Sequence, residues 1–411
     1  MTFWIRSRKT DTIVYPKKRR KSSFAKDATE RFYRGILHAF NLSLNIVFII
    51  LLILSGFSTQ ISPERFILPA LLSLGFPFFV IVNILFVLLW IVRRRWHFAL
   101  SLFCLILLSG NIQNCFPLHP LASNDNLQSD DSIRSIRVLS YNVKLFNFYD
   151  LQHGRNPMLE YIASQDVDIV CLQEFGFYNH KDFLSFDRIL RTMQRNFPYH
   201  HISCRNHERH KSSYGIATFS KFPIIRQGRV NYPSAYSRTV FSDILVGNDT
   251  IRVFNCHLES NQLTIDDKKR MQELMDRKET GNLSQTTGQI SGKLGKAAKI
   301  RARQSDSIHA AVRRSDVSHI ILCGDFNDHP LSYNYKRIRG ELNDAFVSTS
   351  SGFGITYNEF PFYYRIDHLL YSKNVKPDQF RIHRDAVKDG KNLSDHYPIS
   401  CSFFLIPIKT Q

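Results

Sequence analysis

Cysteine is scarce and irregularly placed in this chain of 411 residues. The seven cysteines are scattered singly, and one of them, Cys104, lies within an apolar segment. No CxxC pair and no regular spacing occurs, so the sequence argues against a zinc site and against a disulfide framework. The odd count cannot pair completely, although one bridge stays open if the domain lies outside the cytoplasm.

Acidic residues are also few, with 35 Asp and Glu against 54 Lys and Arg, which gives a net charge of +19. Much of the basic excess stands in PKKRRKSSFAK near the N-terminus and in Arg93–Arg95. Both clusters flank apolar segments, where basic residues set membrane topology. The rest, around residues 207–211 and 293–303, would concentrate a polyanionic substrate without identifying it.

Three long apolar runs occupy the first third of the chain, at about 37–57, 66–92 and 97–115. The first two reach the roughly 20 residues that a helix needs to cross a bilayer, and the third is shorter. Helices are expected because a backbone in lipid must satisfy its own hydrogen bonds, and Pro69 and Pro77 should kink the second. These runs hold no acidic or basic residue to line a polar pathway, which argues against a transporter.

The two basic clusters orient these segments. Residues 1–36 and the Arg93–Arg95 turn are expected in the cytoplasm, because positive charges stay on that side. Three crossings then place the remaining chain outside the inner membrane, on the periplasmic side of a Gram-negative cell. If only two segments cross, the remaining chain faces the cytoplasm instead. Either way the lipid bilayer is an expected partner, and no protein partner is inferred.

Residues 116–132 are rich in Pro, Ser, Asn and Asp and are expected to form a linker to a globular domain over 133–411. Strand and helix patterns intermix in that domain without repeats. Helices are expected at 157–164, at 183–196 and over 264–314, with GNLSQTTGQISGKLG as a flexible loop inside the last. Strands are expected at IRVLSYNV, DVDIVCLQE, GIATFSKFPI, TIRVFNCHL, HIILCGDFND, IDHLLYS and SDHYPISCSFFL.

Polar residues gather where these strands end, and together they supply what phosphoester hydrolysis requires. Taken singly, each has a plainer interpretation: a solvated strand end for Glu174, a core histidine for His257, and turn or cap residues for Asp367 and Asn142. Their combination favours a catalytic site. The candidates are Asn142, Glu174, His257, Asp325, Asn327, Asp367, Asp395 and His396.

Six motifs, SYNV, DIVCLQE, NCHLES, GDFND, IDHLLYS and SDHYPI, occur in the order and approximate spacing of the endonuclease/exonuclease/phosphatase superfamily. The chain resembles this family over about 136–405. The resemblance implies an α/β fold, a four-layer α/β/β/α sandwich, here preceded by a bundle of two to three transmembrane helices. It also implies a metal-dependent hydrolase of phosphoester bonds.

By this resemblance, Glu174 would bind a divalent ion, with Asn142 and Asp367 completing the coordination directly or through water. Oxygen ligands of this kind favour Mg²⁺ or Mn²⁺. Asp325 resembles the family residue that orients or deprotonates the attacking water.

The other candidates have roles around the phosphate. Asn327 would hold Asp325 or the phosphate, and His396 would contact the phosphate or protonate the leaving oxygen. His257 is expected to be catalytic in this context. Asp395 resembles the acidic partner of the site, and it either stays beside His396 or pairs with His257 across the site.

The substrate stays open among nucleic acid, a phospholipid or sphingolipid head group, and other phosphoesters met near a membrane. The HLES motif at His257 is more similar to the deoxyribonuclease and sphingomyelinase branches than to abasic-site endonucleases. The competing hypothesis is a membrane-tethered, catalytically silent binding module with the same fold.

Overall fold

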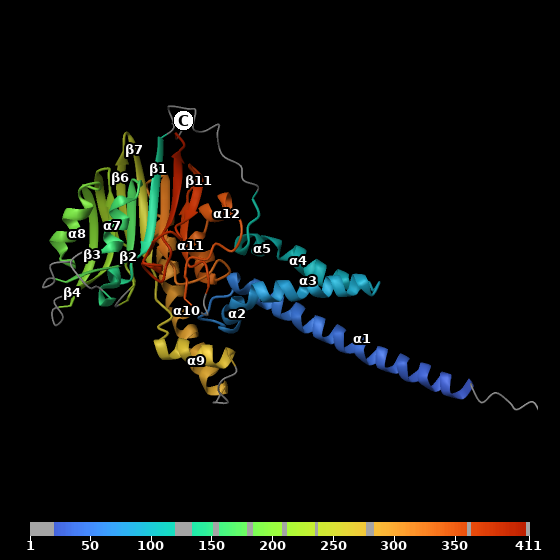
Figure 1. The fold of residues 1–411 in the computed structure, drawn as a ribbon. Helices are drawn as coiled ribbons and strands as arrows, with labels where there is room; N and C mark the ends of the chain where they lie inside the picture. Colours follow the sequence, from blue (N-terminus) through green and yellow to red (C-terminus); the bar gives the residue numbers. More distant parts are fainter. Residues whose placement is uncertain are drawn as a thin grey trace, which may run out of the picture.

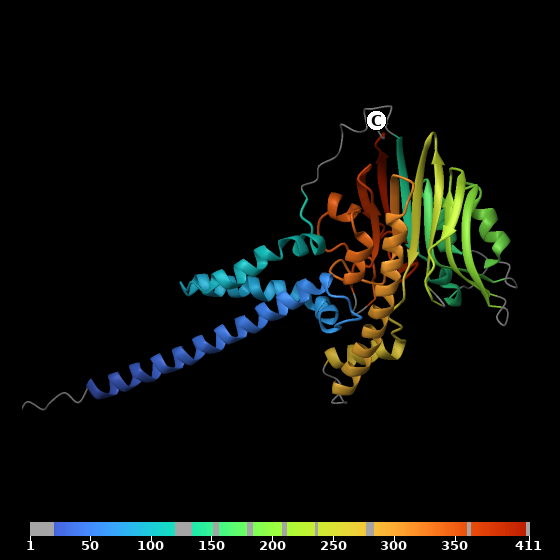
Figure 2. The same ribbon diagram turned by 180° about the vertical axis from the view of Figure 1, so that it is seen from behind.

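The computed structural model describes residues 20–119, 134–150, 156–178, 184–207, 212–234, 237–276, 283–359 and 363–407. The chain forms a β-sandwich with flanking helices and an elongated N-terminal helical bundle that projects from it (Figures 1 and 2).

The bundle follows the apolar pattern of the sequence. Its elements are α1 (Arg20–Gly56), η1 (Phe57–Gln60), α2 (Leu68–Leu72), η2 (Ser73–Gly75), α3 (Phe76–Val92), α4 (Phe98–Leu107) and α5 (Ser109–Cys115). Two stretches, Thr29–Gln60 and Leu68–Val92, are long and apolar enough to cross a membrane. The third apolar run is broken, since α4 and α5 meet at an angle of 63°. The second is interrupted by η2 just before Pro77, where we expected a kink.

Buried polar side chains join the three long helices of the bundle. Asn45 of α1 donates to Ser101 of α4 at 2.7 Å and accepts from the indole of Trp90 of α3 at 2.9 Å. Ser101 in turn donates to Asn83 of α3 at 2.9 Å. In apolar surroundings such hydrogen bonds hold helices in one register.

The first sheet has the strand order β11-β14-β1-β2-β4-β3. Only β1 and β2 are parallel neighbours in it, and the other pairs are antiparallel. Its strands are β1 (Arg134–Asn142), β2 (Ile169–Tyr178), β3 (Tyr199–His207), β4 (Ser212–Ser220), β11 (Val375–Ile382) and β14 (Ile399–Leu405).

The second sheet has the order β5-β6-β7-β8-β10-β9, with β7 and β8 as its parallel pair. Its strands are β5 (Ile224–Arg229), β6 (Arg238–Val246), β7 (Asp249–His257), β8 (His319–Asp325), β9 (Asn343–Asp344) and β10 (Asp367–Tyr371). A separate hairpin joins β12 (Val387–Lys388) to β13 (Lys391–Asn392).

The two sheets pack face to face through alternate apolar side chains such as Val138, Ile169, Val253 and Ile321. Helices α7 (Pro157–Ser164) and α8 (Phe186–Met193) cover the outer face of the first sheet. The second sheet is covered by α10 (Leu283–Arg313) and α11 (Tyr333–Arg339). This confirms the four-layer sandwich. The remaining elements are η3 (Lys144–Asp150), α9 (Ile265–Met275) and α12 (Ala345–Thr349).

One expectation about the long helical region is wrong. The segment GNLSQTTGQISGKLG, predicted as a flexible loop, is helical from Leu283 onward as the first half of α10. Its glycines do not break the helix because packing selects the conformation against weak local preference: Ile290 is buried, and Gly295 lies against Ile67 of the bundle.

The bundle meets the sandwich at the edge where α2 and α11 lie (Figure 1). Leu331, just after β8, is buried among Leu52, Phe76, Cys104 and Leu108 of the bundle. The start of the expected linker also packs on the domain, because the carbonyl of Pro117 accepts from the amide of Gly352. The rest of the expected linker, 120–132, lies outside the described residues.

Candidate active site

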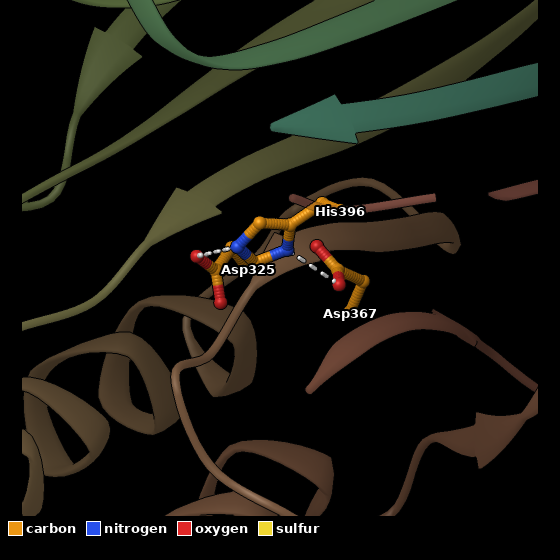
Figure 3. Close-up of side chains that lie close together, drawn as sticks. All are labelled: Asp325, Asp367 and His396. Atoms are coloured by element: carbon orange, nitrogen blue, oxygen red, sulfur yellow. Dashed lines mark hydrogen bonds and ion pairs between the residues drawn. The ribbon is translucent and has the colours of Figure 1, made fainter. Parts of the chain in front are cut away.

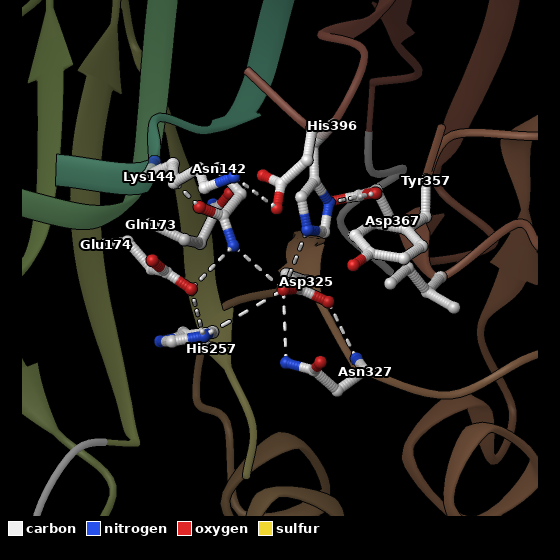
Figure 4. A network of polar contacts seen from close by, with 12 residues as sticks. Asn142, Lys144, Gln173, Glu174, His257, Asp325, Asn327, Tyr357, Asp367 and His396 are labelled. Carbon is white, nitrogen blue, oxygen red and sulfur yellow. Dashed lines mark hydrogen bonds and ion pairs between the residues drawn. The ribbon is translucent and has the colours of Figure 1, made fainter. Parts of the chain in front are cut away.

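The two parallel strand pairs place the candidate residues at one edge of the sandwich. Asn142 ends β1 opposite Gln173 of β2, so Glu174 follows at the same level in the first sheet. His257 ends β7 directly opposite Asp325 at the end of β8 in the second sheet. Because parallel strands end at the same edge, side chains from both sheets meet there (Figure 4).

Asn142 connects the two sheets. Its buried side-chain amide donates to Glu174 Oε1 at 3.3 Å and to Asp325 Oδ2 at 2.9 Å. Its Oδ1 accepts from the backbone amide of Lys144 at 3.0 Å. One neutral side chain therefore holds two carboxylates from different sheets at a fixed separation.

Glu174 stands at an irregularity in β2. The pairing of β2 with β4 shifts register between Leu172 and Phe175, and Glu174 has φ of +48°. Such a bulge re-aims one side chain of a strand, and here it turns the carboxylate toward Asn142 and His257. Burial raises the pKa of Glu174, and the charge of Asp395 raises it further.

Asp325 is the most enclosed carboxylate of the edge, with 1% of its side chain exposed. Burial raises its pKa to about 6 despite the attraction of His396. Asn327 restrains both oxygens, since its backbone amide donates to Oδ1 at 2.7 Å and its side-chain amide to Oδ2 at 3.1 Å.

Gly324, just before Asp325, is required by the close approach of two strands. Its φ is +135°, and a Cβ there would lie 1.9 Å from the carbonyl oxygen of Cys256 in β7. Only glycine lets β8 come this close while adopting that backbone conformation. This spacing brings Asp325 level with His257.

His396 bridges the two aspartates that lie opposite each other on β8 and β10. Its Nδ1 is 2.9 Å from Asp367 Oδ2, and its Nε2 is 3.8 Å from Asp325 Oδ2 (Figure 3). Burial alone would lower the pKa of His396, but the negative charges of Asp367 and Asp325 outweigh it and raise the pKa to about 10. The imidazole is therefore held as a cation.

His257 is different, because burial dominates and lowers its pKa. Its Nδ1 is 3.4 Å from the hydroxyl of Tyr214 in β4. Its Nε2 has no hydrogen-bond partner among the described residues and lies 3.6 Å from Glu174 Oε1 and 3.9 Å from Asp325 Oδ2. A buried nitrogen without a partner, aimed at two carboxylates, indicates a place for a further group.

Asp395 does not contact His257. Its Oδ2 lies 3.0 Å from Lys144 Nζ, and its Oδ1 accepts from Ser394 at 3.3 Å. Burial would raise the pKa of Asp395, but the charges of His396 and Lys144 outweigh it and lower the pKa. The partner of His396 is Asp367 rather than its sequence neighbour.

Several polar residues of the edge were missed from the sequence. Lys144 is one, and Glu359 links it to Lys268, which donates to the hydroxyl of Tyr357 at 2.7 Å. The ring of Tyr357 packs on His396 with centroids 5.0 Å apart. A lysine directly after SYNV was the only available signal, and Glu359 and Tyr357 stand in a segment without strand pattern.

Comparison with known proteins agrees with this geometry. The model of the endonuclease/exonuclease/phosphatase family matches residues 139–396, which is more than half of the chain. The chain belongs to the endonuclease/exonuclease/phosphatase family. A second family model, a domain of unknown function (DUF8431), matches residues 36–115. A search of curated proteins gave no match.

Solved structures similar to this family member include an endonuclease/exonuclease/phosphatase from Beutenbergia cavernae, with 14% identity and a TM-score of 0.46, covering 66% of this chain and 72% of that one. A family protein from Leptotrichia buccalis has 19% identity and a TM-score of 0.44, covering 65% and 99%. Sphingomyelinase C from Streptomyces griseocarneus has 18% identity and a TM-score of 0.43, covering 66% and 99%.

Members of the endonuclease/exonuclease/phosphatase family hydrolyse phosphoesters and usually use a divalent metal. The charges of this site fit such an ion. Four carboxylates, of Glu174, Asp325, Asp367 and Asp395, face two cations, Lys144 and protonated His396. Asp325, Asp367 and His396 place their side-chain oxygen and nitrogen atoms within 4.8 Å of one another, and of these only the carboxylate oxygens could bind an ion while His396 is protonated. The excess of buried negative charge and oxygen donors suits a hard divalent cation.

Proposed function

We propose that this protein is a membrane-anchored, divalent-metal-dependent phosphodiesterase. The observation that carries the proposal is the convergence of carboxylates, an amide and two histidines from both sheets at one edge of the sandwich. These groups differ in charge state because their surroundings differ, which is what acid–base catalysis needs.

Glu174 and Asn142 are the residues that would hold the ion. The Glu174 carboxylate accepts a hydrogen bond from the side-chain amide of Asn142. Asn142 Oδ1 accepts one hydrogen bond from the backbone amide of Lys144, and its second lone pair is available to an ion. Asp367 was expected as a third ligand, and it would act chiefly through His396, to which it is bonded. The bound ion supplies charge neutralisation at the phosphate.

Asp325 would accept the proton of the attacking water. Its raised pKa brings a carboxylate closer to neutral pH, and Asn327 fixes both of its oxygens. The water oxygen forms a bond to phosphorus, and one P–O ester bond breaks. A proton of the attacking water goes to Asp325. The leaving oxygen takes a proton from His396, so atoms and charge balance.

His396 would protonate the leaving oxygen. Asp367 keeps the imidazole charged, and the ring of Tyr357 restrains its orientation. His257, held neutral by burial, would place its unpartnered Nε2 against a phosphate oxygen or the water. Asp395 would hold Lys144 near the phosphate, where the cation stabilises developing negative charge.

The helical bundle would anchor this site in the inner membrane. The N-terminal end of α1 and the Arg93–Arg95 turn after α3 both lie far from the sandwich (Figure 1), and the first basic cluster stands at the start of α1 in the sequence. Because basic loops stay in the cytoplasm, this arrangement favours a catalytic domain on the outer, periplasmic side.

The test uses the full-length protein in detergent, stripped with EDTA and then supplied with Mg²⁺ or Mn²⁺. Hydrolysis of bis(4-nitrophenyl) phosphate should appear only with metal. Asp325→Asn should lower kcat by about 10²- to 10⁴-fold, which is the usual contribution of a general base. Glu174→Gln should instead raise the metal concentration needed for half-maximal activity.

The competing hypothesis is a silent binding module with the same fold. It predicts no turnover with either metal, while phosphoester affinity is retained and is unchanged in Asp325→Asn. Metal-dependent turnover that disappears in that variant excludes it.

A further inference from the structure

A cavity of about 300 Å³ extends from the candidate active site to the helical bundle. At one end it is lined by Glu174, Asp325 and His396 of the sandwich. At the other end it is lined by Ala70, Leu71 and Leu74, which belong to α2 and η2 at the start of the second apolar span. A segment of the membrane bundle therefore forms part of the wall of the active site.

This wall is hydrogen-bonded to the segment that follows Asp325 at the end of β8. Ser58 Oγ donates to the carbonyl of Leu331 at 2.6 Å, and Ser73 Oγ is 3.1 Å from His329 Nε2. The hydroxyl of Tyr364, which also lines the cavity, donates to the carbonyl of Leu74 at 3.0 Å. The segment that follows Asp325 is thus hydrogen-bonded to the bundle at His329 and Leu331. These bonds hold the bundle wall at a fixed position beside the carboxylates.

The chemistry of the cavity changes along its length. Glu174, with the divalent ion that it would hold, and the charged His396 suit a phosphate at the sandwich end, whereas Ala70, Leu71 and Leu74 offer only apolar contact. The cations of the lining are already paired, Lys268 with Glu359 and Arg301 with Asp328. A nucleic-acid strand needs successive free cations for its phosphates, and this lining does not supply them.

The apolar end also lies where the two candidate spans approach the sandwich. Residues 61–67 connect Thr29–Gln60 to Leu68–Val92, the two stretches able to cross a bilayer, and η1 and α2 are the adjoining ends of these stretches. Large apolar side chains stand exposed in and beside this connection, with Phe57 39%, Phe66 50% and Leu68 44% exposed. Such side chains are stable at a bilayer surface and costly in water.

From these observations we infer that the site takes a phosphodiester amphiphile from the membrane, with the phosphate at the strand ends and a hydrocarbon substituent against the α2 wall. The inference rests on the proposed hydrolytic function and adds the substrate class to it. It also makes the bundle a part of the substrate site rather than an anchor alone.

The test compares methyl and hexyl 4-nitrophenyl phosphate below their micellar concentrations, with full-length protein in maltoside and added Mg²⁺. The hexyl ester should have a kcat/KM about tenfold higher than the methyl ester, because part of its longer chain is buried. Ala70→Trp, which fills the wall, and Leu71→Asn, which makes it polar, should reduce this ratio to about 1. Leu68→Trp is the matched control, since Leu68 lies in the same helix, is exposed and does not line the cavity; it should keep the ratio.

Each other outcome has a definite meaning. Turnover of the methyl ester shows whether a variant still has an active site. If one of the two wall variants does not fold, the other still tests the inference. Equal kcat/KM for both esters, or a ratio that the wall variants leave unchanged, would overturn the inference while the proposed function stands. Faster cleavage of a single-stranded oligonucleotide, unaffected by Ala70→Trp, would assign the cavity to nucleic acid.

Absence of all turnover would instead contradict the proposed function, and binding would then decide the inference. Hexyl phosphate and inorganic phosphate are titrated into the wild-type protein and into Ala70→Trp by calorimetry. Tighter binding of hexyl phosphate that is lost in Ala70→Trp supports the amphiphile site. Equal binding of the two ligands overturns it.

Discussion

Replacing Asp367 by asparagine should change how catalysis depends on pH. Asp367 Oδ2 and His396 Nδ1 are 2.9 Å apart, and both side chains are buried. The substitution keeps the shape but removes a charge-assisted hydrogen bond, which is worth about 1.5–3 kcal/mol. At about 1.36 kcal/mol per pKa unit, the pKa of His396 should fall by about 1–2 units from its raised value.

The dependence of stability and kcat on pH follows from the raised pKa of His396. Asp367 and Asp325 raise the pKa of His396 to about 10 against burial, so the charged pair stabilises the fold fully below the ordinary histidine pKa of about 6.5. This stability is lost as the pH rises through the folded pKa. The protonated acid is lost over the same range, so kcat should fall on the alkaline side, and it should fall at lower pH in Asp367→Asn.

The assay is kcat for bis(4-nitrophenyl) phosphate between about pH 6 and pH 10, at saturating Mn²⁺ or Mg²⁺. Asp395→Asn is the matched control, because Asp395 pairs with Lys144 and contributes less than Asp367 to the pKa of His396. In Asp395→Asn, the pH at which kcat falls on the alkaline side should shift by less than in Asp367→Asn. An alkaline limb at the same pH in Asp367→Asn and wild type would refute the assignment of His396 as the acid.

Three further predictions concern stability and topology. Gly324→Ala should lower the free energy of unfolding, measured by urea titration, by more than about 2 kcal/mol, because the added Cβ would overlap the β7 backbone. Gly288 lies in open space within α10, so Gly288→Ala should raise the free energy of unfolding by about 0.5–1 kcal/mol. Arg365→Leu should cost about 3–5 kcal/mol by leaving a buried aspartate unpaired, whereas Arg381→Leu, in an exposed pair, should cost at most about 1 kcal/mol. A cysteine at the Arg93–Arg95 turn and a C-terminal tag should label from opposite sides of the membrane; labelling from one side would contradict three crossings.

The sequence predicted which residues converge at this edge where the local pattern and the geometry of the edge coincide. Asn142, His257 and Asp325 each end a strand, and parallel pairing brings such ends together without further information. Asp325 and Asn327 are two residues apart, so their contact is local.

The sequence left contacts undecided, or gave the wrong structure, where the deciding contact is long-range. Asp367 rather than Asp395 pairs with His396 because β10 lies beside β8, which no spacing along the chain reveals. The continuity of α10 depends on its packing against Ile67, 228 residues before Gly295. The α2 wall of the active site likewise joins segments about 250 residues apart, such as Ser73 and His329.

We propose that this edge of the sandwich hydrolyses phosphodiesters by attack of water on phosphorus. The most direct measurement is turnover of bis(4-nitrophenyl) phosphate by the full-length protein with Mg²⁺ in H₂¹⁸O, followed by mass spectrometry of the products. We predict one ¹⁸O atom in the phosphate monoester, none in the nitrophenol, and turnover at least about 100-fold slower in Asp325→Asn. Label in the nitrophenol, or equal turnover by Asp325→Asn, would contradict the account.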